Sequence, residues 1–153
     1  NMSEFVGDPG NIVSIRKLPE YHSEICKFLK KRSPLNHVTV MMKKSCLEKA
    51  GGYLDWRYME DYFLWIRMYL AGVKFYNIQD NLVNVRIDDL FKRRAGFRYF
   101  KNLANLQKFM LKNKVISFPR YLINVFIRFV QFISPNWLKK LVYKSVLRER
   151  IKN

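Results

Sequence analysis

Glu60-Asp61-Tyr62-Phe63-Leu64-Trp65-Ile66-Arg67 is the stretch that most constrains the fold of this chain. It follows a loop that begins at Gly51-Gly52-Tyr53, and it stops at Ala71-Gly72. Its aromatic and aliphatic residues predict an amphipathic helix over 60–71, so two adjacent carboxylates fall at a loop-to-helix junction. The free N–H groups and positive end of a helix favour ionised carboxylates there. The pair is therefore either a reactive site beside an open loop or an ordinary charge cluster at a helix start.

The overall charge of the chain points to an anionic partner. With 153 residues, of which 49% are hydrophobic, the chain is long enough for one domain with a core and is not a disordered tail. It carries 29 lysines and arginines against 12 acidic residues, a formal net charge of +17. Such an excess suits nucleic acid, anionic lipid headgroups or a phosphorylated substrate.

Cysteine usage and the start of the chain bear on its compartment. Cys26 and Cys46 lack the spacing of a disulfide framework or a metal site, so reduced cytosolic thiols are expected. Residues 1–5 do not resemble a signal peptide, and no run reaches the roughly 18 to 20 apolar residues of a spanning helix. The turn signal at Gly7-Asp8-Pro9-Gly10 follows at once, which is typical of the middle of a longer protein.

Local patterns predict alternating strands and helices up to about residue 88. The turn signals and apolar periodicities give strands at 12–15, 38–42, 74–78 and 82–86, and helices at 19–31 and 60–71, with Pro19 in the first helical turn. A capping box formed by Ser45 and Glu48 is expected to open a further short helix that Gly51 closes.

The pattern becomes helical from about Asp89. A weak apolar stripe predicts a helix from residue 100 to near Asn113, and a second helix is expected over Phe118–Ile133, ended by Pro135. This second helix has one narrow polar row, made of Arg120, Asn124, Arg128 and Gln131. A further basic helix is predicted from Trp137 onward. We therefore divide the chain into residues 1–88 and a helical tail, 89–153.

Four motifs in order resemble a known family. They are Arg32-x-Pro34-Leu35-Asn36-His37-x-Thr39, Ala50-Gly51-Gly52-Tyr53, Glu60-Asp61-x-x-Leu64-Trp65 and Gly72-x-Lys74-Phe75. Together they resemble the C-terminal half of the catalytic domain of family 2 glycosyltransferases, inverting enzymes of the GT-A fold that use nucleotide sugars. The resemblance covers about residues 10–90. It implies an α/β fold class, here an α+β acceptor-side half followed by C-terminal helices. The tail is similar to the basic helical tails of bacterial members that build surface polysaccharides.

The resemblance implies that Asp61 is the catalytic base. It would take the proton from the acceptor hydroxyl as that hydroxyl attacks the anomeric carbon of the donor. An inverting displacement needs one carboxylate opposite the leaving nucleoside diphosphate and no covalent intermediate. Glu60 either orients the acceptor, holds the loop, or is only a helix-start charge.

The resemblance also implies roles for several polar residues. His37, in a loop with Arg32 and Asn36, would line the cleft and bind sugar hydroxyls, or would merely brace the loop. Arg86, at the end of the last strand, would lie near the pyrophosphate, or is a solvated surface residue. Trp65 is predicted to be a core residue rather than a platform for sugar stacking.

The chain departs from the family pattern in one respect. Members carry, upstream, a nucleotide-binding half with an Asp-x-Asp motif that binds Mg or Mn together with the donor. This sequence contains no such motif. The nearest approach to it is Asp88-Asp89, in which no residue separates the two aspartates. We therefore expect a C-terminal fragment that holds no metal ligand of its own and is inactive alone.

The basic tail suggests an attachment to membranes. From Lys114 to Asn153 there are nine lysines or arginines and one acidic residue, Glu149. A helix with a wide apolar arc followed by a basic one suits an interfacial anchor on anionic lipid over 118–153. The other interpretation is that 118–133 packs as an ordinary core helix. The anchor would place the protein at the cytoplasmic face of the membrane, where a lipid-linked acceptor would be found.

Two other classes of protein are compatible with parts of this sequence. A nucleic-acid-binding module is compatible with the charge, but no helix-turn-helix, zinc or RNA-recognition signature supports it, so no nucleic-acid partner is expected. A non-catalytic scaffold at the membrane surface would follow if the upstream half were absent from the gene.

Overall fold

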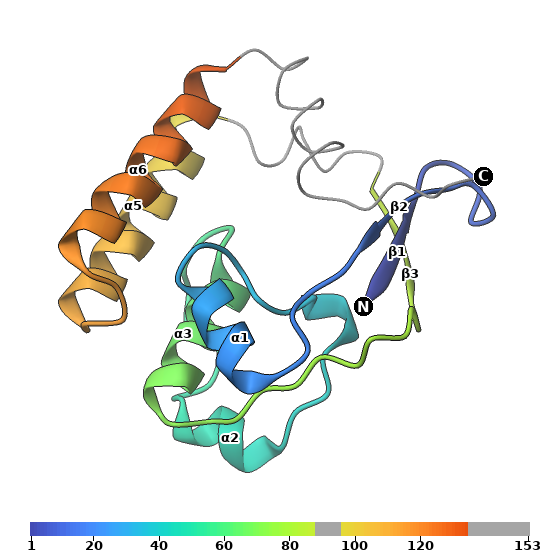
Figure 1. The fold of residues 1–153 in the computed structure, drawn as a ribbon, viewed down its shortest axis with the longest axis horizontal. Coiled ribbons are helices and arrows are strands. Elements are labelled where there is room, and N and C mark those ends of the chain that lie inside the picture. The colour runs from blue at the N-terminus through green and yellow to red at the C-terminus, as the bar shows by residue number, and fades with distance from the viewer. Residues whose placement is uncertain (88–95, 135–153) are drawn as a thin grey trace.

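The computed structural model describes residues 1–87 and 96–134, which form a small mixed sheet and a set of helices (Figure 1). In chain order the elements are β1 (Met2–Phe5), β2 (Ile12–Arg16), α1 (His22–Leu29), the 3₁₀ turn η1 (His37–Thr39), α2 (Lys44–Lys49), α3 (Glu60–Leu70), β3 (Asn84–Arg86), α5 (Phe97–Lys112) and α6 (Phe118–Ile133). This is an α+β arrangement, as expected for the chain.

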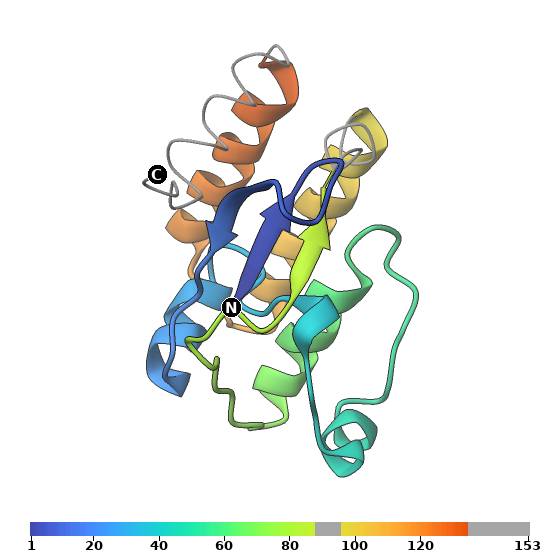
Figure 2. The same ribbon diagram turned by 90° about the vertical axis from the view of Figure 1, so that its right-hand side faces the viewer.

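The sheet has β1 at its centre. The strand order is β2-β1-β3, with β1 antiparallel to β2 and parallel to β3. Figure 2 shows the three strands side by side, with α5 and α6 on the far side of the molecule. The predicted turn joins β1 to β2, and in it the Gly10 N–H donates to Asp8 Oδ1 at 2.7 Å. β1 itself was not predicted, because Ser3 and Glu4 break its apolar pattern although both are buried.

The core is built around α3. Leu64, Trp65 and Ile66 are all fully buried. They belong to one apolar cluster that also takes Leu29 from α1 and Leu106 from α5. α3 is therefore hydrophobic on almost every side, which is typical of a helix packed between other elements. The prediction that Trp65 is a core residue is confirmed.

α5 and α6 form an antiparallel hairpin (Figure 1). Their bounds confirm the helices predicted at 100–113 and 118–133. In the connection the Val115 N–H donates to the Met110 carbonyl at 2.9 Å, and both Val115 and Ile116 are buried. The predicted break at Pro135 and the predicted helix from Trp137 lie outside the described residues.

Two predicted strands are wrong. Residues 38–42 do not form a strand, because the Thr39 N–H and hydroxyl both bond to the Asn36 carbonyl, at 2.8 and 2.9 Å, and close η1 instead. Residues 74–78 bond to the segment around α1: the Asn77 N–H donates to the Glu20 carbonyl at 3.0 Å. The strand predicted at 82–86 is shorter than expected and consists of Asn84–Arg86.

The short helix α2 exists as predicted but does not begin with a capping box. Its N-cap is Lys43, whose side chain makes no capping hydrogen bond, and Ser45 lies inside the helix. The C-terminal prediction is confirmed at Gly51, which follows the C-cap with a φ of +79°. Glycine adopts this left-handed backbone without a Cβ penalty, so it turns the chain into the next loop.

Candidate active site

The two carboxylates lie at the start of α3, where they were predicted. Asp61 is half-buried, and its Oδ1 accepts a hydrogen bond from the Tyr62 N–H at 2.7 Å. Glu60 is exposed, and its Oε1 accepts from the Tyr58 N–H at 3.1 Å. Tyr58 has a φ of 70°, a left-handed backbone that is strained for a bulky side chain. Glu60 thus supports the loop before α3, while Asp61 keeps part of its surface open to solvent.

Arg67 fastens the glycine-rich loop to α3. Its Nη1 donates to the Ala50 carbonyl at 2.5 Å, and its Nη2 donates to the Gly52 carbonyl at 2.7 Å. The guanidinium also lies over the Phe63 ring, 4.6 Å from its centroid. Burial lowers the pKa of Arg67. No role for Arg67 could be predicted from the sequence. Its partners are main-chain carbonyls, which every residue has whatever its side chain.

Three elements meet at His37. This exposed side chain places Nε2 3.1 Å from the Tyr53 hydroxyl, and the two rings stack with centroids 5.8 Å apart. The imidazole also lies nearly perpendicular to the Trp65 ring of α3, with ring centroids 6.0 Å apart. Asp61 lies one helical turn before Trp65, on the same face of α3. The folded chain therefore assembles His37, Tyr53 and Trp65 on the side of α3 that carries Asp61.

The other predicted site residues differ in their surroundings. Asn36 is 3% exposed, and its Oδ1 is buried without a hydrogen-bond partner in the described part of the chain. Arg32 lies over the Phe28 ring at 5.5 Å. Arg86 ends β3 and lies over the Phe5 ring at 5.4 Å.

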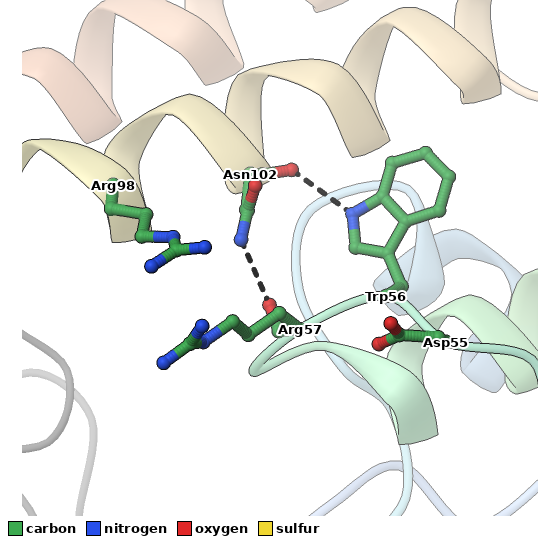
Figure 3. Close-up of a pocket in the computed structure, with 5 residues that line it drawn as sticks. All are labelled: Asp55, Trp56, Arg57, Arg98 and Asn102. Carbon is green, nitrogen blue, oxygen red and sulfur yellow. Dashed lines mark hydrogen bonds between the residues drawn. The ribbon is translucent and has the colours of Figure 1, made fainter.

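A shallow hollow lies beside the loop that enters α3 (Figure 3). Its volume is about 360 Å³, and it is lined by Asp55, Trp56, Arg57, Arg98 and Asn102. Two hydrogen bonds close the contact between loop and helix. The Trp56 Nε1 donates to the Asn102 carbonyl at 3.2 Å, and the Asn102 Nδ2 donates to the Arg57 carbonyl at 3.1 Å. None of the predicted site residues lines this hollow. The only feature of the sequence that pointed to a cationic site was the excess of basic residues.

The narrow polar row of α6 faces the rest of the protein. Asn124 is 6% exposed and donates to Gln107 Oε1 at 2.7 Å and to the Lys30 carbonyl at 2.8 Å. Arg128 Nη2 donates to the Lys31 carbonyl at 3.4 Å. The apolar arc is left on the surface, where the exposed side chains are Phe118, Leu122, Ile123, Phe126, Ile127, Phe129, Val130 and Ile133. We call this the α6 apolar face.

The described residues offer neither a metal-binding cluster nor a membrane-spanning helix. Within 1–87 and 96–134, no group of three or more His, Cys, Asp or Glu side chains is placed to hold a metal ion. Over the same ranges no helix is both long enough and apolar enough to cross a bilayer.

The chain is similar to several bacterial enzymes. It is 34% identical over 148 residues to an Escherichia coli protein named UDP-Gal:alpha-D-GlcNAc-diphosphoundecaprenol beta-1,3-galactosyltransferase, a match that covers 96% of this chain and 54% of that protein. It is 34% identical to an uncharacterized glycosyltransferase of Haemophilus influenzae, covering 97% of this chain and 55% of the relative. It is 30% identical to an amylovoran biosynthesis glycosyltransferase of Erwinia amylovora, a match that covers 86% of this chain and 50% of that protein.

These matches are to curated proteins alone. No protein-family model matches the chain, and no solved structure does. The chain spans about half the length of the curated relatives it matches. Over most of its own length it is homologous to proteins that are named as bacterial glycosyltransferases.

Proposed function

We propose that this chain is part of an inverting glycosyltransferase of family 2 with the GT-A fold. It would transfer a sugar from a nucleotide-sugar donor to a hydroxyl of a lipid-linked saccharide in the synthesis of a bacterial surface polysaccharide. The names of the relatives support the reaction class, and the name of the E. coli relative supports a diphosphate-lipid acceptor. The observation that carries the assignment to this chain is the half-buried Asp61 at the start of α3, beside the group formed by His37, Tyr53 and Trp65.

In this proposal Asp61 acts as the general base. Its carboxylate accepts the proton of the acceptor hydroxyl while the hydroxyl oxygen forms a bond to the anomeric carbon. The bond between that carbon and the donor diphosphate breaks in the same displacement, and the nucleoside diphosphate leaves with the electron pair. General base catalysis of this kind contributes about 10²- to 10⁴-fold to the rate.

The neighbouring residues would position the acceptor. His37 is exposed and can exchange its bond to Tyr53 for one to a sugar hydroxyl. The unpartnered Oδ1 of Asn36 is a further acceptor next to it in sequence. Glu60 supports the loop through the Tyr58 N–H and has a positioning role. Arg32 and Arg86 are assigned to substrate binding on the family resemblance.

The metal expected with a nucleotide sugar does not fit this chain. The sequence contains no Asp-x-Asp motif, and the described residues hold no group of carboxylates and histidines suited to a cation. We therefore assign no metal ligand here and expect Mg or Mn to be bound by the nucleotide-binding half of the enzyme. For the same reason we propose that this chain is inactive alone.

We further propose that the tail associates with the membrane surface. In the α6 apolar face, the side chain of Phe126 is 66% exposed and that of Ile133 is 61% exposed. Contiguous exposed apolar side chains on an amphipathic helix suit insertion at the headgroup boundary, and the basic residues that follow would favour anionic lipid.

The test is the substitution Asp61→Asn in the full-length protein, assayed with a nucleotide sugar and a lipid-linked acceptor. D61N is isosteric but cannot take a proton, so kcat should fall about 10²- to 10⁴-fold while the KM for the donor changes little. E60Q should cost much less, and D8N, in the turn between β1 and β2, should behave as the unaltered protein. A D61N enzyme with unchanged kcat would remove this residue from the mechanism, and a product with retained anomeric configuration would exclude the single displacement.

A further inference from the structure

The strongest unassigned feature of the molecule is the hollow between the loop before α3 and the start of α5. We propose that Arg57 and Arg98 in this hollow bind the diphosphate group of the lipid that carries the acceptor saccharide. The inference rests on the proposed function and deepens it, because it assigns a substrate-binding site to residues outside the family motifs.

The two arginines come from distant segments and face the same space. Figure 3 shows both guanidinium groups on one side of the hollow and the Asp55 side chain on the other side. The loop cannot drift from the helix without breaking the bonds that join Trp56 and Arg57 to Asn102, at 3.2 and 3.1 Å. The arrangement of the two cations is therefore a property of the fold.

The hollow holds two positive charges and the single negative charge of Asp55. Within residues 1–87 and 96–134, neither Arg57 nor Arg98 forms an ion pair, and the only ring contact of Arg57 is with Tyr58 at 5.2 Å. Two guanidiniums side by side repel each other, and an anion between them removes that repulsion. The planar fork of arginine matches phosphate oxygens in paired hydrogen bonds, so a group with several phosphate oxygens is the best occupant. A volume of about 360 Å³ leaves room for a diphosphate.

An aromatic cluster on the side of α5 that faces α6 favours one of the two diphosphates in the reaction. Phe97, the neighbour of Arg98, is 65% exposed and contacts Phe132 of α6 with ring centroids 6.1 Å apart. Phe100 adds contacts to Phe132 at 5.6 Å and to Phe129 at 5.9 Å. A nucleotide continues from its diphosphate into a polar ribose, whereas a lipid diphosphate continues into an apolar chain. The two arginines of the hollow and the exposed Phe97, which precedes Arg98 in the chain, are together complementary to the lipid.

The position of the hollow is also compatible with catalysis. Arg57 precedes Asp61 by one short segment of loop, so their main chains are no more than about 14 Å apart even if that segment were fully extended. A saccharide attached to a diphosphate at Arg57 can therefore extend along the loop toward the proposed base. The same segment carries Tyr58 and Glu60, whose hydrogen bond fixes its conformation.

The test measures binding of farnesyl diphosphate, a soluble probe with a diphosphate and an isoprenoid chain, to the full-length protein by calorimetry. The double variant R57Q/R98Q should bind the probe at least tenfold more weakly, and each single variant several-fold more weakly. The control K108Q removes one positive charge from an exposed position of α5 that does not line the hollow, and it should bind normally. Farnesol should bind much more weakly than farnesyl diphosphate, and UDP affinity should be unchanged in R57Q/R98Q.

Three results would overturn the proposal. They are unchanged farnesyl diphosphate binding in R57Q/R98Q, an equal loss in K108Q, and a loss of UDP affinity at least as large as that for the lipid probe. The last result would assign the arginines to the donor. Because binding is measured without turnover, failure of the proposed transfer reaction, read from D61N, is distinguishable from failure of this site. Circular dichroism of each variant shows whether the fold is retained.

Discussion

Asn124 Nδ2 lies 2.7 Å from Gln107 Oε1, in the buried contact between α6 and α5. The same amide nitrogen lies 2.8 Å from the Lys30 carbonyl oxygen, in the segment after α1. One side chain thus joins the helical hairpin to the body of the protein. Because the polar residues of α6 are used for this contact, its aliphatic and aromatic residues are left on the surface.

The first prediction concerns this contact. Asn124→Ala should lower the free energy of unfolding by about 1 to 3 kcal/mol, because the buried Gln107 Oε1 and Lys30 carbonyl lose a donor. Asn105→Ala is the matched control, since Asn105 is an exposed residue of α5 and its loss should change stability by no more than about 0.5 kcal/mol. Urea unfolding followed by circular dichroism measures both. Equal stability of N124A and N105A would show that the amide contact contributes nothing.

The second prediction concerns the α6 apolar face. Phe126→Glu places a charge at a side chain that is 66% exposed and should reduce binding to anionic vesicles several-fold without unfolding the hairpin. Asn105→Glu adds the same charge to an exposed position of α5, away from the apolar face, and should bind more tightly than F126E. Co-sedimentation with vesicles of neutral and of anionic lipid gives the readout. If the unaltered protein binds neither kind of vesicle, α6 is not a membrane-binding element.

The third prediction concerns the link between Arg67 and the glycine-rich loop. Arg67→Lys keeps the charge but cannot reach both the Ala50 and Gly52 carbonyls, so it should destabilise the fold by about 1 to 3 kcal/mol. The loop that carries Tyr53 should also be cut faster by chymotrypsin under native conditions. Arg120→Lys, the same replacement on α6, is the control and should change neither measurement. Normal protease resistance in R67K would mean that other contacts hold the loop.

The fold was predictable where periodicity alone determines an element. The helices at α1, α3, α5 and α6 follow apolar patterns that survive in the structure. The pattern of α6 correctly separated its polar row from its apolar arc, but it could not tell which of them faces the protein. That choice depends on Gln107 and on the Lys30 carbonyl, which are distant in sequence from Asn124.

The errors have local physical causes. A β-rich composition at 38–42 was outweighed by the bonds of Thr39 to the Asn36 carbonyl. β1 was missed because its buried Glu4 reads as a surface residue, although the Ser14 hydroxyl donates to its carboxylate at 2.6 Å.

The candidate site was predictable only in part, for the same reason. The sequence placed Asp61 at a helix start and named His37. It could not bring Arg98 and Asn102 next to the loop at Arg57, because that contact joins two distant segments through main-chain carbonyls. Motifs along the chain therefore indicate the carboxylate proposed as the general base, whereas the proposed diphosphate site depends on tertiary structure.

The fourth prediction is a pH dependence of stability that arises at His22. Burial, and to a smaller extent the charge of Lys74, lowers the pKa of His22 from its ordinary value of 6.5. Its Nδ1 accepts a hydrogen bond from the Phe75 N–H at 3.2 Å, which requires the neutral ring. In the unfolded chain His22 is therefore protonated near pH 6.5, whereas in the folded chain it is protonated only at a lower pH. The contribution of His22 to stability is fully present above that pH and is lost as the pH falls below it, until the lower pKa of the folded state is reached.

The substitution His22→Asn isolates this effect. Its amide oxygen can accept from Phe75 but does not titrate, so the loss of stability between pH 7.5 and about 5.5 should be smaller in H22N than in the unaltered protein. His37→Asn removes the other histidine of the chain, an exposed one, and should retain the original pH dependence. Urea midpoints measured across this range decide the matter. A pH profile that is the same for H22N and the unaltered protein would assign the acid sensitivity to the carboxylates rather than to the contact between α1 and Phe75.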